Sequence, residues 1–195
     1  MVPFIGLTGG IGSGKSTALA ALGRLGAATL STDRVVHELY ETDEVRTAVV
    51  ERFGQPLLRE GEIDRAALAR VAFATDEDRR WLERLLWPRV GERMIAWRAE
   101  QERRSPTPRA LVVEVPLLFE SGLDRGYDAT IAVIADEAIR HRRAGDRGHE
   151  ALNERVARQL SQQEKSQLAT YTVVNDGSEA ELETRLSSIL EMLST

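Results

Sequence analysis

The sequence lacks cysteine entirely and contains only two lysines, Lys15 and Lys165, among 195 residues. The absence of cysteine excludes disulfide bonds, Cys-ligated zinc, iron–sulfur clusters and cysteine nucleophiles. Of the 26 basic residues two are lysines, which leaves 24 arginines. This excess is a general bias of composition, so each of the two positions that keep lysine calls for a reason.

Long apolar runs and a basic surplus are also missing. No apolar run approaches eighteen residues, so the sequence predicts no transmembrane helix. The start, residues 1–7, is too short and has no basic residue before its apolar run, so we do not expect a signal peptide there. The net charge of −5 makes the chain a poor candidate for a general nucleic-acid binder, since such proteins need a dominant basic face. We expect a cytoplasmic protein without nucleic-acid or membrane partners. The sequence does not indicate how many copies of the chain assemble.

Short, β-rich apolar runs alternate with helical patterns. The run 4–8 and the next strand flank a helix from Lys15 to Leu25 that stops at Gly26, a βαβ arrangement in which the strands are parallel. The expected strands are 4–8, 27–30, 110–115, 129–135 and 171–174. Together they predict an α/β fold with a five-stranded parallel sheet.

Two helical insertions interrupt this pattern. Residues 33–104 show no convincing strand. Helices are expected over 45–53, after the capping Asp64, and over 76–86, with Pro88 in the first turn of the next helix. Residues 140–158 are highly charged and predict two helices outside the core.

A glycine-rich stretch, Gly9-Gly10-Ile11-Gly12-Ser13-Gly14-Lys15-Ser16, fits the phosphate-loop template G-x-x-x-x-G-K-[ST]. In such a loop, backbone amides and a helix N-terminus bind phosphate, the lysine reaches the β- and γ-phosphates, and the serine hydroxyl binds Mg²⁺. A chance glycine turn is the alternative, but the stretch lies between a strand and a helix, as the mechanism demands. The predicted ATP-contacting residues are Gly10, Ile11, Gly12, Ser13, Gly14, Lys15, Ser16 and Thr17, with Ser16 as the Mg²⁺ ligand.

Four other charged groups carry open alternatives. Asp33, just past the second strand, could accept a proton from an attacking hydroxyl, hold Mg²⁺ through water, or cap a helix beginning near Val35. Arg143 and Arg147, at i and i+4, could close over ATP phosphates or be placed by chance. Glu114 ends the third strand and could support Mg²⁺ or be structural.

Lys165 follows a possible Ser161–Glu164 capping box. No ligand-binding role emerges for it, and we predict that it lies on the surface.

The sequence resembles the dephospho-CoA kinase family over nearly its whole length. The resemblance rests on the phosphate loop with its flanking residues (7–17), on Leu25-Gly26-Ala27 leading to Asp33, on Val115-Pro116-Leu117-Leu118-Phe119-Glu120-Ser121-Gly122-Leu123, on the spacing of Arg143 and Arg147, and on Arg155-Val156-Ala157-Arg158-Gln159. It differs from the family pattern at Ser31, where Asp is usual, and at Trp87, where His is usual.

The resemblance implies ATP-dependent phosphorylation of the ribose 3′-hydroxyl of dephospho-CoA, the last step of coenzyme A synthesis. It also implies that Asp33 is the catalytic carboxylate and that Arg143 and Arg147 belong to a lid. The implied fold is a P-loop NTPase core with a helical acceptor-binding insertion and a helical lid. The core would comprise residues 1–32, 105–137 and 161–195, the acceptor-binding region 33–104 and the lid 138–160.

Three other functions are compatible with a phosphate loop. Another small-molecule kinase would share the fold and differ in the acceptor pocket. A GTP-dependent switch would need a guanine-reading Asn-Lys-x-Asp motif, but neither lysine follows an asparagine. A non-catalytic ATP-binding module is the third alternative.

Overall fold

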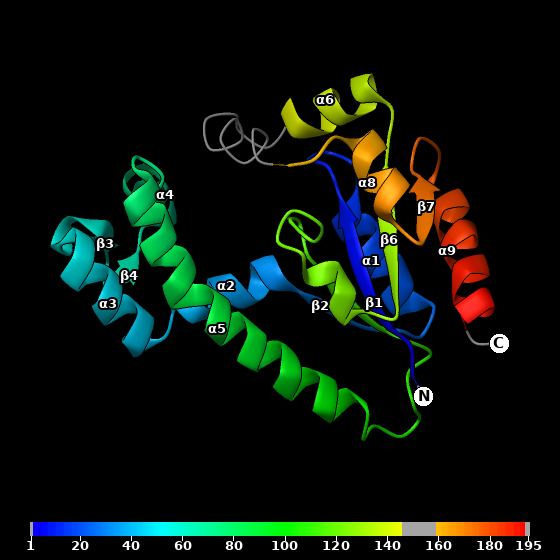
Figure 1. Cartoon of the computed structure of the whole chain (residues 1–195), viewed down its shortest axis with the longest axis horizontal. Coiled ribbons are helices and arrows are strands. Elements are labelled where there is room, and N and C mark those ends of the chain that lie inside the picture. The colour runs from blue at the N-terminus through cyan, green and yellow to red at the C-terminus, as the bar shows by residue number, and fades with distance from the viewer. Residues whose placement is uncertain (1, 146–158, 194–195) are drawn as a thin grey trace. The chain divides into compact units, whose positions relative to one another are not determined.

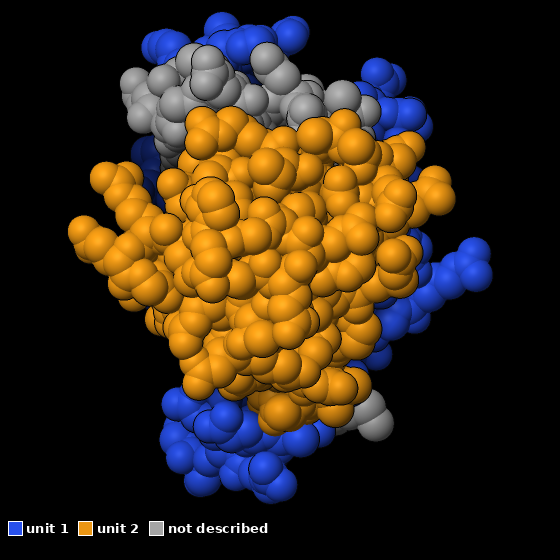
Figure 2. Space-filling view, turned by 90° about the vertical axis from the view of Figure 1, so that its left-hand side faces the viewer, with its two compact units in different colours: residues 1–31, 98–195 blue, residues 32–97 orange. Residues whose placement is uncertain are grey.

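The computed structural model describes residues 2–145 and 159–193. Arg147 and the motif residues 155–158 therefore lie outside the described residues. The chain forms two compact units, unit 1 with residues 1–31 and 98–195, and unit 2 with residues 32–97 (Figure 2). Unit 2 ends at Trp97, inside a long helix. Among the helices of residues 2–145 and 159–193, none combines the length and the hydrophobicity of a membrane span.

Unit 1 is built on the predicted five-stranded parallel sheet (Figure 1). Its strands, in spatial order, are β2 (Ala28–Ser31), β5 (Leu111–Glu114), β1 (Phe4–Gly9), β6 (Ala129–Ile134) and β7 (Tyr171–Val174). Every residue of β1 and β5 is buried, which explains why most of their residues are apolar. The first two strands are parallel but not adjacent, because β5 pairs with both of them.

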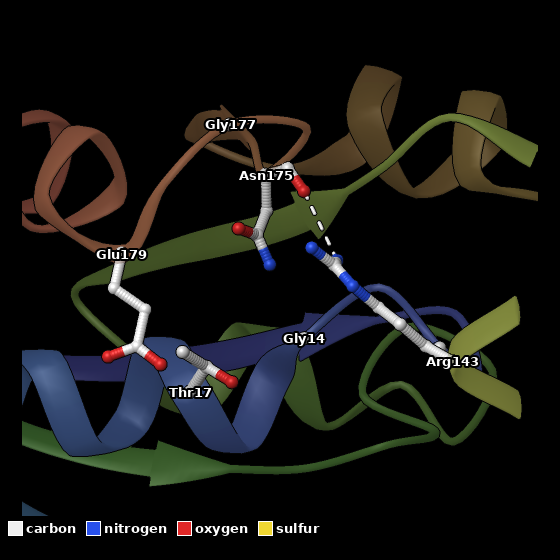
Figure 3. A pocket seen from close by; sticks show the side chains of 7 residues that line it. Gly14, Thr17, Arg143, Asn175, Gly177 and Glu179 are labelled. Atoms are coloured by element: carbon white, nitrogen blue, oxygen red, sulfur yellow. Dashed lines mark hydrogen bonds between the residues drawn. The ribbon is translucent and has the colours of Figure 1, made fainter. Parts of the chain in front are cut away.

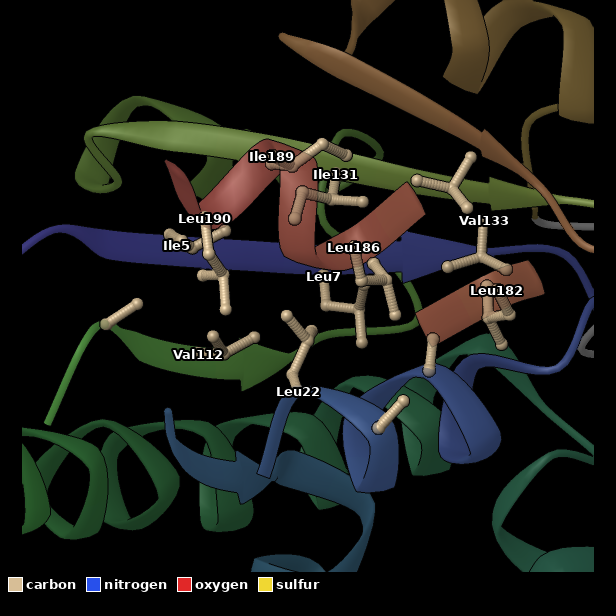
Figure 4. Packing of buried hydrophobic residues seen from close by; sticks show 14 residues of the cluster. Ile5, Leu7, Leu22, Val112, Ile131, Val133, Leu182, Leu186, Ile189 and Leu190 are labelled. Atoms are coloured by element: carbon tan, nitrogen blue, oxygen red, sulfur yellow. The ribbon is translucent and has the colours of Figure 1, made fainter. Parts of the chain in front are cut away.

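The main core lies on one face of this sheet. Alternate residues of β1, Ile5 and Leu7, pack there against α1 (Lys15–Arg24) and α9 (Glu179–Leu193) (Figure 4). Helix α9 contributes Leu182, Leu186, Ile189 and Leu190. Ser178 and Glu181 form a capping box at the start of this helix, a pattern that can be read from the sequence.

The opposite face of β1 carries Phe4, Gly6 and Thr8. Gly6 makes room for a neighbour, since a Cβ there would lie 2.9 Å from a Leu118 methyl group. Phe4 stacks on Tyr127 with ring centroids 4.6 Å apart. Helix α8 (Gln162–Leu168) packs on the same region of the sheet. Thr8 therefore faces α8 rather than the main core.

Unit 2 contains α2 (Thr32–Tyr40), α3 (Asp43–Phe53), α4 (Arg65–Ala72) and most of α5 (Asp76–Gln101). The prediction of no strand in this region is wrong, because β3 (Leu58–Arg59) and β4 (Glu62–Ile63) form a small hairpin. Its turn residues, Glu60 and Gly61, both have positive φ. Two-residue strands are too short to show alternation, and Glu-Gly is not a strong hairpin signal.

Helix α5 corrects a second prediction, because it runs through Pro88 without a break. Pro88 lacks the N–H that would bond to the carbonyl of Arg84, four residues earlier. Both residues are exposed, so water can hydrate that carbonyl. The Arg89 side chain also donates a 2.6 Å hydrogen bond to the Leu85 carbonyl. The sequence fits a proline in a first turn equally well, so it could not decide the question.

Replacing Pro88 by alanine should stabilise the protein, because alanine restores the missing hydrogen bond and suits a helix interior. We expect the free energy of unfolding in urea to rise by about 1–3 kcal/mol. Gly91→Ala in the same helix is a matched control, since an added Cβ would meet no atom within 4 Å outside its neighbours and the backbone of its own helix, and it should add about 1 kcal/mol or less. A fall in the free energy of unfolding of Pro88→Ala would contradict this expectation. It would show that the packing of α5 depends on the proline.

Candidate nucleotide-binding site

The phosphate loop lies between β1 and α1, as the sequence predicts. Gly12 and Gly14 have φ values of 75° and 91°, in the left-handed region that glycine adopts at little cost. Backbone of this kind turns successive amides toward one concavity, which suits an anion. Helix α1 begins at Lys15, and Gly14 has no side chain with which to cap it. The positive end of the helix dipole is thus available to a phosphate group.

The Lys15 ammonium bridges this loop. Its Nζ donates a 3.1 Å hydrogen bond to the Gly10 carbonyl, and the residue is half-buried. Ser16 is exposed and Thr17 is half-buried on the first turn of α1. Lys15 is therefore held close to the position that phosphate groups would occupy in the concavity.

Two residues that are not among the predicted site residues donate hydrogen bonds to backbone carbonyls of the loop. Arg140, on α6 (Glu137–Gly145), donates a 3.0 Å hydrogen bond to the Ile11 carbonyl. Asn175, just after β7, donates a 2.9 Å bond to the Ser13 carbonyl. Both segments follow the carboxyl ends of strands in the parallel sheet, where open α/β sheets bind ligands. That position is the feature by which the sequence could have indicated these two residues.

The glycines of the loop permit this close packing. A Cβ on Gly12 would lie 2.5 Å from the Arg140 carbonyl oxygen, and a Cβ on Gly14 would collide with the Asn175 side-chain amide. Any larger residue would push α6 or the segment after β7 away from the loop. The glycines therefore serve packing as well as backbone conformation.

A cavity of about 180 Å³ opens beside the loop (Figure 3). Arg143 points into it from α6, and its Nη1 donates a 3.2 Å bond to the Asn175 carbonyl. The lining residues are Gly12, Gly14, Thr17, Arg143, Asn175, Gly177 and Glu179. The structure thus brings one of the two predicted arginines to the phosphate loop.

Asn175→Asp tests the packing of this loop. A carboxylate in place of the amide would face the Ser13 carbonyl, and two acceptors repel each other in a buried site. We expect the dissociation constant for ATP to rise about tenfold or more, as measured by calorimetry, because a lost buried hydrogen bond is worth about 1–3 kcal/mol. Asp176→Asn is the matched control, since an amide oxygen can still accept the bond from the Asp136 amide. Equal ATP affinity in Asn175→Asp and the parent would contradict the role of Asn175.

The prediction that Lys165 lies on the surface is wrong. Its side chain is fully buried, and its Nζ forms a 2.7 Å ion pair with Glu120. Burial lowers the pKa of Lys165, and the hydrogen bond to Glu120 opposes that shift. The predicted Ser161–Glu164 capping box is present at the start of its helix. Glu120 lies 45 residues earlier in the sequence, so no local pattern indicates the pair.

Comparisons with known proteins agree with this geometry. A family model described as dephospho-CoA kinase matches residues 3–181. The chain belongs to the dephospho-CoA kinase family. This confirms the resemblance inferred from the sequence.

The dephospho-CoA kinase of Protochlamydia amoebophila is 34% identical over 97% of this chain and 95% of that protein. The crystal structure of TT1252 from Thermus thermophilus is 32% identical, with a TM-score of 0.79 and complete coverage of both chains. A dephospho-CoA kinase from Campylobacter jejuni shares the fold, with a TM-score of 0.70 at 23% identity over 100% of this chain and 98% of that one.

Asp33, which the family resemblance marks as catalytic, belongs to unit 2. It is exposed in the first turn of α2, two residues after β2 ends at Ser31. The alternative that it caps a helix beginning near Val35 is wrong, because α2 already begins at Thr32. Its role as a base stays a prediction.

The residues present fit a magnesium ion that a kinase of this family would use. The Ser16 hydroxyl is exposed at the start of α1, and Glu114 is buried at the carboxyl end of β5, beside β1. Both offer oxygen ligands, which Mg²⁺ prefers. The described residues contain no group of three or more His, Asp or Glu side chains that could hold a metal ion. Mg²⁺ in kinase sites usually keeps several waters and nucleotide phosphates as ligands.

Proposed function

We propose that this dephospho-CoA kinase family member transfers the γ-phosphoryl group of ATP to the ribose 3′-hydroxyl of dephospho-CoA. The observation that carries the proposal is the phosphate loop, whose backbone carbonyls accept hydrogen bonds from Arg140 and Asn175. It lies in a chain that the family model matches over almost its whole length. Mg²⁺ would be held at Ser16 and would neutralise phosphate charge when bound. That the protein is cytoplasmic and binds no nucleic acid stays a prediction from the sequence.

The phosphate loop supplies the ATP side of this reaction. The loop amides, the N-terminus of α1 and Lys15 would bind the β- and γ-phosphates. The cavity bordered by Thr17, Asn175 and Gly177 would take the rest of the nucleotide, since it adjoins the loop. Phosphoryl transfer needs positioning and charge neutralisation more than covalent chemistry, and this set of groups supplies both.

Asp33 would serve the acceptor. Its carboxylate would accept the proton of the 3′-hydroxyl while the ribose oxygen forms a bond to the γ-phosphorus. The bond between that phosphorus and the β–γ bridging oxygen breaks, and ADP leaves with the electron pair. Residues 33–104 would bind dephospho-CoA, and the segment 138–160 would act as the lid.

Arg143 would stabilise charge on the phosphates, because its guanidinium enters the cavity beside the loop. We expect Arg143→Met to lower kcat/KM for ATP about 10²-fold. Arg142→Met is the matched control, since Arg142 is exposed on the same helix, and it should leave kcat/KM within about twofold. Equal losses in both variants would argue against a specific role for Arg143.

A phosphotransfer panel tests the acceptor. With ATP as donor, dephospho-CoA, adenosine, AMP and gluconate are compared by ADP release under identical conditions. We expect dephospho-CoA to have the highest kcat/KM. Preference for any of the other three would assign the same fold to a different small-molecule kinase.

A further inference from the structure

The Lys165 ammonium joins three separate segments of unit 1. Besides the ion pair with Glu120, its Nζ donates a 2.9 Å hydrogen bond to the Pro116 carbonyl and a 3.3 Å bond to Thr8 Oγ1. Thr8 Oγ1 in turn donates a 3.3 Å bond to the Pro116 carbonyl. An ammonium has three donors, and all three are used. Glu120 Oε1 also accepts a 2.8 Å bond from the Leu160 amide.

Helix α8 is held to the sheet by polar side chains rather than by apolar burial. Lys165 is its only buried residue, while Leu168 is 57% exposed. The Gln162 side chain pairs with the backbone of Ala135, accepting at 2.8 Å and donating at 2.9 Å. The position of the helix thus depends on where these two polar side chains bind.

Stability alone is a poor explanation for this network. A buried ion pair can often be replaced by apolar residues of similar volume at no cost. Glu120 Oε2 is buried and has no hydrogen-bond partner within the described part of the chain, which adds a further cost. As a purely structural contact, this network would therefore stabilise the protein less than apolar side chains would.

Its location indicates a functional reason. Thr8 immediately precedes Gly9, where the phosphate loop begins, and Pro116 lies two residues after Glu114 at the end of the neighbouring strand. The network therefore ties the start of the phosphate loop to the segment that follows β5.

Building on the function proposed above, we propose that Lys165 is a positioning residue for phosphoryl transfer. Through Thr8 and Pro116 it fixes the start of the phosphate loop relative to the segment after β5. A planar guanidinium, bulkier than an ammonium, would not fit the fully enclosed site. Both lysines of this arginine-rich chain then serve the same loop, Lys15 within it and Lys165 at its start.

Three variants separate positioning from stability. Lys165→Met alone leaves the Glu120 carboxylate buried without its cation and should lower Tm by about 5–10 °C. Adding Glu120→Gln removes that charge and keeps a carbonyl for the Leu160 amide, so Tm should return to within about 3 °C of the parent. Thr8→Val removes only the hydroxyl from the network. Arg24→Met, which breaks the exposed pair with Glu183, is the control.

We expect the double variant Glu120→Gln/Lys165→Met to stay impaired although its stability recovers. Assayed well below its Tm, it should show kcat/KM for ATP reduced about 10- to 100-fold, because small displacements of positioned groups cost this much. Thr8→Val should lose about three- to tenfold, and Arg24→Met should match the parent. Recovery of kcat/KM together with Tm in the double variant, or parent-like kinetics in Thr8→Val, would overturn the proposal.

The ATP dissociation constant is measured beside turnover, and we expect it to rise about tenfold in the double variant. This separates two kinds of failure. A parent protein that does not phosphorylate dephospho-CoA would refute the proposed function, while an unchanged ATP affinity in the variants would refute the role of Lys165.

Discussion

Replacing Lys15 by alanine should lower kcat for phosphoryl transfer to dephospho-CoA by about 10³-fold, because the β- and γ-phosphates lose the only side-chain cation within the phosphate loop. The ammonium is held in place by its 3.1 Å bond to the Gly10 carbonyl, so water cannot replace it with the same geometry. Turnover is measured by ADP release with saturating acceptor. Circular dichroism and Tm should show that the fold is kept.

Lys15→Arg is the matched variant, because it keeps the positive charge and changes only its shape. A guanidinium is planar and forked, whereas the loop encloses a point charge. We expect Lys15→Arg to be nearly as inactive as Lys15→Ala. Activity of Lys15→Ala within a few-fold of the parent would show that Lys15 does not act on the phosphates.

Asp33→Asn should lower kcat by about 10²–10⁴-fold, because an amide cannot accept the proton of the attacking hydroxyl. The substitution keeps the size of the side chain, and Asp33 is exposed in the first turn of α2, so folding should be little affected. Steady-state kinetics with dephospho-CoA give kcat and KM separately. A base role predicts that KM for ATP stays close to the parent value.

Asp43→Asn provides the control for Asp33→Asn. Asp43 is also an exposed carboxylate in the first turn of a unit 2 helix. It should leave kcat within about twofold of the parent. If Asp33→Asn also kept kcat within a few-fold, the carboxylate would not be the base.

Features of the fold that depend on nearby residues were predictable. The five strands are short apolar runs bounded by turns, and the phosphate loop is a contiguous motif between a strand and a helix. The caps at Asp64 and Ser178 were predictable for the same reason, since each side chain bonds to an amide two or three residues away.

Contacts between distant segments were not predictable from one sequence. Asn175 reaches Ser13 across 162 positions, and Arg140 reaches Ile11 across 129. Lys165 follows a capping box and looks like a surface residue until the sheet brings Thr8 and Glu120 to it. The continuity of α5 through Pro88 was not predictable for another reason. A proline is tolerated both in the first turn of a helix and in an exposed helix interior.

The product of the reaction tests the proposed function most directly. The protein is incubated with ATP, Mg²⁺ and dephospho-CoA, and the product is isolated and examined by ³¹P NMR and mass spectrometry. We expect one added phosphoryl group per molecule, present as a monoester on the ribose 3′-oxygen, together with one equivalent of ADP. A phosphoryl group at any other position, or ATP consumption without a phosphorylated product, would contradict the proposed reaction.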